Sequence, residues 1–458
     1  MTSKRNYYTY GLGTIGRDML YSLVSMYLIY YLTDVINLPN SSLWWVAAIM
    51  LFARIFDAFN DPIMGVIVDN TKGRFGKFKP WITIGAFFSG LLTVLLFTDF
   101  GLTGSGFIVM FFFVYILWGV SFTANDIAYW SMLPSLTLDQ KGREKIGAFA
   151  RICANIGLFT VVAGIVPITT ALESKTGSMS SAYMIFAIAV VAVLWLGQSI
   201  TIFGVKEPKN VFAEQPSTKL RELFHIIVKN DQLLYVVISM ALFMIGYVTT
   251  TSFGLYFFKY AFKDEGMYSI FALILGVSQL IALMVFPLFS RKYDRKTLYT
   301  GATVFVIVGY ILFFFSPMNM AYIGVAGILL FLGQAFIQLL MLMFLADTIE
   351  YGQWKLGKRN ESITFSLQPF INKIGGAIGS GIVSITVIVS GISTAETPDD
   401  VTSKGLLIMK TAMLLIPPFI ILISYLIYRY KYKIDAKLYN EIISDLKERG
   451  DIKINSHF

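Results

Sequence analysis

About twelve apolar stretches of roughly 20 residues or more run along this sequence, and they leave few folds open to the chain. A helix needs about 20 apolar residues to cross the hydrocarbon core of a bilayer, whereas a barrel strand needs about ten, with polar residues at alternate positions. These stretches are longer than such strands and apolar on all faces, so we predict an all-α integral membrane protein with twelve transmembrane helices. The stretches lie near 11–36, 43–68, 81–99, 106–133, 147–170, 182–204, 232–260, 267–289, 298–316, 322–346, 365–391 and 406–428.

Composition excludes several classes of protein. Only 14% of the residues are charged and 56% are hydrophobic, whereas about 25% are charged in soluble proteins. Cys153 is the only cysteine and there are two histidines, so a disulfide framework and a histidine-based zinc site are excluded. No catalytic motif or separate catalytic domain is present. We therefore expect neither an enzyme nor a resident cofactor.

The net charge of +9 follows the membrane topology and does not indicate a nucleic-acid partner. Basic residues gather in alternate connections between the apolar stretches, and loops rich in lysine and arginine stay in the cytoplasm. Both termini are therefore predicted to be cytoplasmic. The basic connections are 72–79, 141–145, 206–229, 291–296 and 355–359.

The longest polar connection divides the chain into six plus six predicted helices. We predict an N-terminal half over 1–204, a central cytoplasmic loop over 205–231, a C-terminal half over 232–429 and a cytoplasmic tail over 430–458, which includes a short amphipathic helix. Two similar six-helix halves with a binding site between them at mid-membrane are typical of secondary transporters. The expected fold is thus two six-helix halves of a transporter.

Two acids on the second predicted span indicate a cation site. Asp57 and Asp61 are one helical turn apart and face the same side, where they repel each other unless a cation lies between them. Asn60, and Thr123 if spans 2 and 4 are adjacent, would add amide and hydroxyl oxygens, which hard cations prefer. The alternative is that both acids pair with basic side chains to hold the bundle together, the candidates being Arg54, Arg151 and Lys373.

A second set of polar residues is suited to a sugar. Carboxylates and a guanidinium exchange hydrogen bonds with hydroxyl groups, and an indole face stacks on the apolar face of a sugar ring. Asp18, Asp126, Trp130 and Arg151 combine these groups. The alternative for Trp130 is a packing or interfacial aromatic.

Five stretches of the sequence carry a family resemblance that extends along nearly the whole chain. The chain resembles the glycoside–pentoside–hexuronide:cation symporters of the major facilitator superfamily, and within them the bacterial melibiose carrier. The stretches are Tyr10–Asp18, Ala53–Gly65, Gly73–Trp81, Trp118–Trp130 and Ala346–Gly352.

The resemblance implies cation-coupled sugar symport in the bacterial inner membrane. It implies that Lys373 lies near both sites and balances the acids. It assigns the coupling cation to Asp57, Asp61, Asn60 and Thr123. It assigns the sugar to Asp18, Asp126, Trp130 and Arg151, together with Lys373.

Departures from the melibiose carrier leave the substrate open. Ser25 stands where that carrier has a tyrosine near its sugar site, and Gln338 where it has a tryptophan. Sodium at Asp57 and Asp61 is the expected coupling ion, with protons or lithium as alternatives because a carboxylate pair can also hold a proton. A cation-coupled carrier of lipids or lysolipids on the same fold is the alternative function. The glycoside, the ion stoichiometry, the oligomeric state and the regulation are not specified by the sequence.

Overall fold

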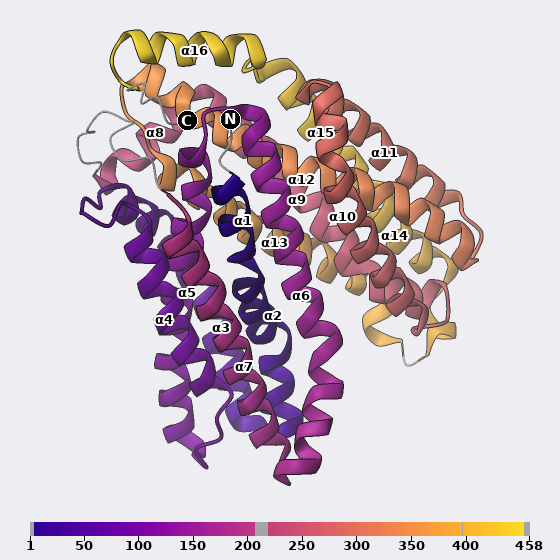
Figure 1. Cartoon of the computed structure of the whole chain (residues 1–458). Helices are drawn as coiled ribbons and strands as arrows, with labels where there is room; N and C mark the ends of the chain where they lie inside the picture. Colours follow the sequence, from indigo (N-terminus) through magenta and orange to yellow (C-terminus); the bar gives the residue numbers. More distant parts are fainter. Residues whose placement is uncertain (1–3, 207–218, 396, 453–458) are drawn as a thin grey trace. The chain divides into compact units, whose positions relative to one another are not determined.

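The computed structural model describes residues 4–206, 219–395 and 397–452, and in this part of the chain the regular elements are all helices (Figure 1). The chain divides into two compact units. Unit 1 is Met1–Leu223 with Asn360–Ser366 and Gly450–Phe458, and unit 2 is Phe224–Arg359 with Leu367–Arg449. Residues 207–218 of the predicted central loop and 453–458 of the predicted tail lie outside the described residues.

Unit 1 contains the first six predicted spans. The α-helical part of its first span is short. The helix continues without a break into a wider π-helical turn, η1. The elements are α1 Lys4–Leu12, α2 Thr14–Tyr30, η1 Tyr31–Val35, α3 Asn40–Asp69, α4 Lys79–Leu96, α5 Gly104–Leu136, α6 Gln140–Thr176, α7 Met179–Gly204 and the 3₁₀ turn η2 Leu220–Glu222.

Unit 2 contains the other six spans and two shorter α-helices. Its last span is made of α14 and α15 together. The elements are α8 Leu223–Lys229, α9 Asp231–Tyr256, the π turn η3 Phe257–Ala261, α10 Met267–Lys292, α11 Arg295–Phe315, α12 Met320–Leu356, α13 Glu361–Val389, the 3₁₀ turns η4 Ile392–Thr394 and η5 Pro398–Asp400, α14 Ser403–Leu414, α15 Ile416–Lys431 and α16 Ala436–Glu448.

The predicted fold class is confirmed. Eleven helices in the described residues are long and apolar enough to cross a membrane, and α2 with η1 supplies a twelfth continuous helix from Thr14 to Val35. Most structural helices are longer than the apolar stretches: α6 begins at Gln140 and ends at Thr176, well outside the predicted 147–170. Asp139 explains that early start, because its side chain accepts a hydrogen bond from the Gly142 amide and caps the helix.

Small residues let the helices of unit 1 approach closely. A Cβ atom on Gly16 of α2 would collide with the backbone of Leu194 on α7, and one on Gly157 of α6 would collide with the carbonyl oxygen of Ile15. Close packing of this kind replaces the hydrophobic effect as the force between helices in a membrane. It fixes α2 between α6 and α7.

Buried amides bind four helices of unit 1 together. The Nδ2 of Asn125 on α5 donates to the carbonyl oxygen of Ile82 on α4 at 2.9 Å and to the Oε1 of Gln198 on α7 at 3.0 Å. The Nε2 of Gln198 in turn donates to the carbonyl oxygen of Gly13, just before α2, at 2.7 Å. Asn125 therefore has a structural role next to the candidate site residue Asp126.

The end of α3 holds the start of α13 by ion pairs and a helix cap. Both carboxylate oxygens of Asp69 accept hydrogen bonds from the backbone, one from the amide of Ser362 at 3.0 Å and one from the amide of Ile363 at 2.9 Å. The ammonium of Lys77 lies 2.5 Å from Asp69 and 3.2 Å from Glu361. The two acids are almost fully buried, so their charges depend on Lys77 and on the amides of α13.

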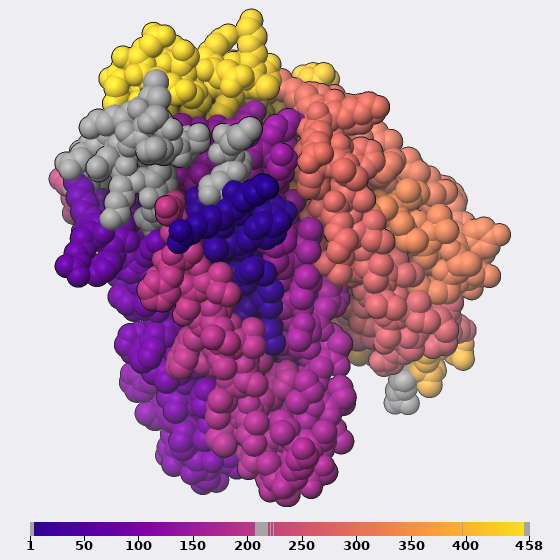
Figure 2. Space-filling model, viewed as in Figure 1, coloured from indigo at the N-terminus to yellow at the C-terminus, as the bar shows by residue number. Residues whose placement is uncertain are grey.

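The helix expected in the tail is α16, and it packs against α12 (Figure 1). Its apolar face is buried, with Tyr439, Ile442 and Leu446 all nearly inaccessible. The indole nitrogen of Trp354 donates to Asp445 at 2.9 Å. Figure 2 shows this yellow C-terminal segment at the molecular surface.

Candidate sugar and cation sites

Eight of the nine predicted site residues lie in unit 1, on α2, α3, α5 and α6. Lys373 is the exception. It lies on α13 within unit 2, where it is half-buried. The sites described below are accordingly those of unit 1.

The guanidinium of Arg17 lies between two predicted sugar ligands. Its Nη2 is 2.8 Å from a carboxylate oxygen of Asp18, and its Nη1 is 2.7 Å from a carboxylate oxygen of Asp126. Arg17 is buried, whereas the side chains of Asp18 and Asp126 are 24% and 23% exposed. One buried cation thus joins α2 to α5 and leaves both acids partly open.

Trp130 contacts two guanidinium groups. The guanidinium carbon of Arg151 is 4.4 Å from the indole centroid and that of Arg17 is 5.1 Å away, both within the range of a cation–π interaction. The indole is only 5% exposed. In this arrangement Trp130 holds the two arginines in place.

The charges of this cluster sum to zero, because Arg17 and Arg151 balance Asp18 and Asp126. The helices that carry them are joined beside the cluster. The hydroxyl of Thr14 on α2 donates to the carbonyl oxygen of Ala150 on α6 at 2.9 Å, one residue before Arg151. The result is a neutral but strongly polar set of hydrogen-bonding groups.

The predicted cation ligands lie along the contact between α3 and α5. The hydroxyl of Thr123 donates to a carboxylate oxygen of Asp61 at 3.3 Å, and Asp61 is 1% exposed. Asp57 lies against Gly119, where an added Cβ would be 3.0 Å from its Oδ1. Both contacts step four residues forward on each helix, so α3 and α5 run parallel here and spans 2 and 4 are adjacent.

The amide of Asn60 is half-buried beside Asp61, and its buried Nδ2 has no hydrogen-bond partner among the described residues. A buried polar atom without a partner is rare in proteins and calls for an explanation. The oxygen and nitrogen of an amide are nearly the same in shape, so rotation of this side chain would present its oxygen at the same position. That oxygen would then supply a further ligand beside the acid pair.

Three residues of these sites were not assigned from the sequence. Arg17 and Tyr21 lie on α2, and Gly119 lies on α5. The signal for Arg17 was present, because a charge within a span is expensive and it directly precedes Asp18. Tyr21 is 48% exposed, and its hydroxyl group lies near the carboxylates of Asp18, Asp57 and Asp126. It therefore lies close to acids of both sites.

Comparison with known proteins identifies the family of the chain. The profile of the family described as MFS/sugar transport protein matches residues 9–436. The chain is a member of the glycoside–pentoside–hexuronide:cation symporter family. It is accordingly a multi-pass membrane transporter of the major facilitator superfamily and not an enzyme.

The relatives of this symporter include a raffinose carrier and a lactose permease, both from bacteria. The raffinose carrier protein of Pediococcus pentosaceus is 32% identical over 98% of this chain and 72% of its own length. The lactose permease of Lactobacillus delbrueckii subsp. bulgaricus is 30% identical over 96% of this chain and 72% of its own length. The crystal structure of the E. coli fucose:proton symporter FucP matches 95% of this chain and all of its own chain, with a TM-score of 0.69 at 13% identity, which shows a shared fold.

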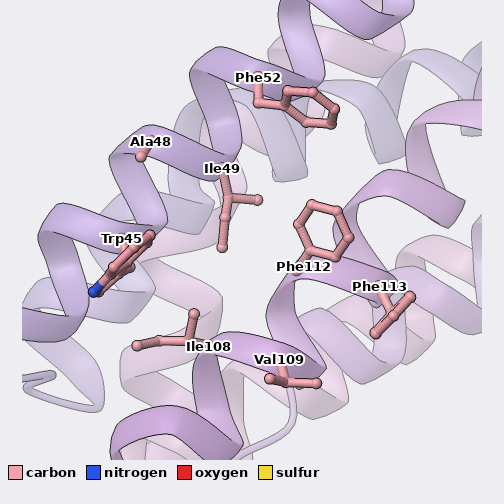
Figure 3. A pocket seen from close by; sticks show the side chains of 8 residues that line it. All are labelled: Trp45, Ala48, Ile49, Phe52, Ile108, Val109, Phe112 and Phe113. Atoms are coloured by element: carbon pink, nitrogen blue, oxygen red, sulfur yellow. The ribbon is translucent and has the colours of Figure 1, made fainter.

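The symporter also has an apolar groove of about 340 Å³ in unit 1 (Figure 3). Its lining comes from the first halves of α3 and α5 and is entirely hydrocarbon and aromatic, apart from the indole nitrogen of Trp45. The acid pair begins at Asp57, beyond the last groove residue of α3, Phe52. The groove is therefore separate from the polar sites. Its lining residues are Trp45, Ala48, Ile49, Phe52, Ile108, Val109, Phe112 and Phe113.

Proposed function

We propose that this protein is a cation-coupled symporter of a glycoside or related sugar, that sodium is its coupling ion, and that it works by alternating access. The observation that carries the proposal is the pair of polar sites within unit 1. A neutral cluster of two arginines and two acids, suited to hydroxyl groups, lies near a pair of acids on α3, suited to a small hard cation. The sugar transport of the named relatives supports the same substrate class.

The sugar site is proposed to consist of Asp18, Asp126, Arg151 and Arg17. The two acids would accept hydrogen bonds from sugar hydroxyl groups, and Arg151 would donate to them. Arg17 would hold both carboxylates at a fixed separation. A hydrogen bond between a charged group and a hydroxyl contributes about 1.5–3 kcal/mol, so a few such bonds suffice for a millimolar to micromolar affinity.

We assign stacking on the sugar ring to Tyr21 and a positioning role to Trp130. Trp130 is almost inaccessible and has Arg151 over its ring, whereas Tyr21 is half exposed. One face of the Tyr21 ring stacks on Phe122 with 5.2 Å between centroids. An aromatic ring fixed on one face offers its other face to the apolar side of a sugar.

The cation is proposed to bind at Asp57 and Asp61, with Asn60 and Thr123 as further oxygen ligands. Its charge would relieve the repulsion of the acids and fix α3 against α5. Tyr21 lies near Asp57 as well as Asp126, so cation binding would also organise the sugar site. Lys373 is proposed to balance these acids in the transport cycle, and the protein to lie in the bacterial inner membrane with both termini in the cytoplasm.

The apolar groove of Figure 3 is the feature that a lipid or lysolipid carrier would use. It could receive an acyl chain. Its lining has no charged side chain for a polar headgroup, however, and the charged cluster is not part of it. The charged cluster of unit 1 therefore favours a sugar over a lipid as the substrate.

The experiment that tests the function is uptake of radiolabelled raffinose, lactose and melibiose into vesicles containing the purified protein. Each sugar is tested with an imposed gradient of sodium, lithium or protons. Accumulation driven by sodium supports the whole proposal, and accumulation driven by protons alone replaces the ion. If no sugar accumulates under any gradient while a labelled lysolipid does, the proposal is wrong.

A further inference from the structure

Unit 2 carries an uncharged polar cluster at mid-membrane depth, formed by Tyr247 on α9, Gln279 on α10 and Gln338 on α12. The Nε2 of Gln279 donates to the Tyr247 hydroxyl at 3.2 Å, and the amide of Gln338 also hydrogen-bonds that hydroxyl. Each residue lies close to the middle of its helix. Three helices of one unit therefore bring amide and phenol groups to one point.

All three side chains are half-buried, so part of each remains accessible. Exposed amides would be costly in contact with hydrocarbon, so a polar group in this position faces water or a ligand. The lipid-type face of α10 is marked by the exposed side chains of Val277 and Ile281. Gln279 is two residues from each, and two residues turn an α-helix by about 200°. Gln279 therefore points away from the apolar face of its own helix.

The cluster is supported from behind by a second set of polar groups that is fully buried. The hydroxyls of Thr250 and Tyr310 are 2.5 Å apart, and the Nε2 of Gln334 lies 3.5 Å from the same tyrosine oxygen. Gln334 is one turn from Gln338 on α12, and Thr250 follows Tyr247 by three residues on α9. Gln334 and Thr250 thus hold in place the helix turns that carry Gln338 and Tyr247.

We propose that Tyr247, Gln279 and Gln338 of unit 2 exchange hydrogen bonds with hydroxyl groups of the sugar. The inference rests on the proposed function, that the substrate is a sugar. Two amides and a phenol supply both donors and acceptors in a fixed arrangement, which matches the hydroxyl groups of a sugar ring. The cluster contains no charge, so it favours a neutral ligand such as a sugar over an ion.

A purely structural network and a binding site differ in what their loss changes. Loss of a structural bond lowers the melting temperature and the maximal rate. Loss of a sugar contact raises KM for the sugar, with the half-saturating cation concentration and the melting temperature unchanged. The substitutions Gln279→Met, Gln338→Met and Tyr247→Phe keep the side-chain size nearly constant, and Gln338→Asn keeps the amide.

The test is the KM for radiolabelled raffinose and lactose in vesicles containing each full-length variant. We expect Gln279→Met and Gln338→Met each to raise KM about tenfold, as loss of one or two hydrogen bonds to the sugar would. Gln338→Asn should retain part of the affinity. Thr300→Val is the matched control, because it removes a half-buried hydroxyl whose oxygen lies 3.0 Å from that of Tyr425 in the same unit.

Three results would overturn the site. Sugar uptake by the unsubstituted protein with KM unchanged in all variants rejects the site and leaves the proposed function intact. A rise in KM that Thr300→Val reproduces shows a general packing effect and rejects it too. Failure of the unsubstituted protein to carry either sugar rejects the proposed function and the site together. If Gln338→Met does not fold, Tyr247→Phe and Gln338→Asn carry the same test.

Discussion

The buried guanidinium of Arg17 makes the two partly open acids of unit 1 depend on each other. Its Nη1 is committed to Asp126 and its Nη2 to Asp18, so loss of either acid leaves a buried positive charge with half its partners. Such a loss costs more than the hydrogen bond itself, because the remaining charge stays in a low-dielectric site. The residues of the sugar site therefore act as a unit.

Replacement of Asp18 by alanine is expected to abolish sugar binding and to leave cation binding in place. The substitution removes one acceptor for sugar hydroxyls and one of the two carboxylates that pair with Arg17. Binding of labelled raffinose and of sodium to the purified variant measures the two effects separately. Retained raffinose affinity would contradict the role of Asp18.

Replacement of Asp57 or Asp61 by cysteine is expected to abolish cation-stimulated uptake with normal expression. Each acid supplies half of the negative charge that holds the ion. Initial uptake rates with and without a sodium gradient are the measurement. Normal sodium stimulation in both variants would rule out a cation site at this pair.

Gly119 is expected to tune the affinity for the cation through its contact with Asp57. A Cβ at this position would be 3.0 Å from the Asp57 carboxylate and would displace it. We expect Gly119→Ala to raise the half-saturating sodium concentration about tenfold, equivalent to about 1.4 kcal/mol. Gly106→Ala on the same helix is the control, because no described atom lies within 4 Å of that Cβ position. Equal effects of both substitutions would contradict the role of Gly119.

The second half of helix α3 carries aspartates with two different roles. Asp57 and Asp61 face α5, and Asp69 at its last residue caps the start of α13. The cation site and the cap are therefore parts of one continuous helix, which includes Pro62.

Lys77 is expected to stabilise the joint of α3 and α13 in a pH-dependent way. Burial alone would lower the pKa of Lys77, but Asp69 and then Glu361 raise it above its usual value of 10.5. The resulting stabilisation is complete below about pH 10.5 and is lost as the pH rises through the higher pKa of the folded state. We expect Lys77→Met to lower the unfolding free energy by about 3 kcal/mol near neutral pH and to remove this alkaline loss.

Thermal unfolding in detergent between pH 7 and pH 11 measures the effect of Lys77. Lys263→Met is the control, since Lys263 pairs with Asp399 where both side chains are mostly exposed. Such a pair contributes little. A melting temperature of Lys77→Met equal to that of the control at neutral pH would exclude the proposed stabilisation.

The sequence predicted the number of membrane helices and their type well, but it did not predict where each helix ends or how it is rotated. Long apolar stretches report the part of a helix that faces hydrocarbon, so α6 and α12 extend beyond their apolar parts, by a polar cap at Asp139 in one case and by a polar last turn in the other. The match of Gly119 to Asp57 could not be predicted, because a glycine in an apolar span has many possible reasons. The open face of Tyr21 likewise depends on helix rotation, which apolar runs do not specify.

For the whole molecule, the sequence predicts six spans on either side of a central loop, but it gives no sign of an exchange of segments between the two units. Asn360–Ser366 groups with unit 1 although the rest of α13 belongs to unit 2. Only three-dimensional contacts such as those of Asp69 with Ser362 and Ile363 reveal this. The role predicted for Lys373 stays a prediction.

Coupling between the two sites predicts a reciprocal effect on affinity. If sodium raises the affinity for raffinose by some factor, raffinose must raise the affinity for sodium by the same factor, because both describe one free energy. We expect a factor between about 5 and 150, the usual range for coupled sites. Calorimetric titration of each ligand with and without the other measures it, and independent binding would contradict a shared mechanism.

The charges of Arg17, Arg151, Asp18 and Asp126 sum to zero, so a neutral sugar bound among them adds nothing to the charge that crosses the bilayer. The membrane potential acts with about 2.3 kcal/mol per elementary charge for each 100 mV. The cluster would therefore feel the same electrical force with and without sugar. Voltage would act on the acid pair and its cation, and an electrical recording from this carrier would count ions while remaining blind to the sugar that travels with them.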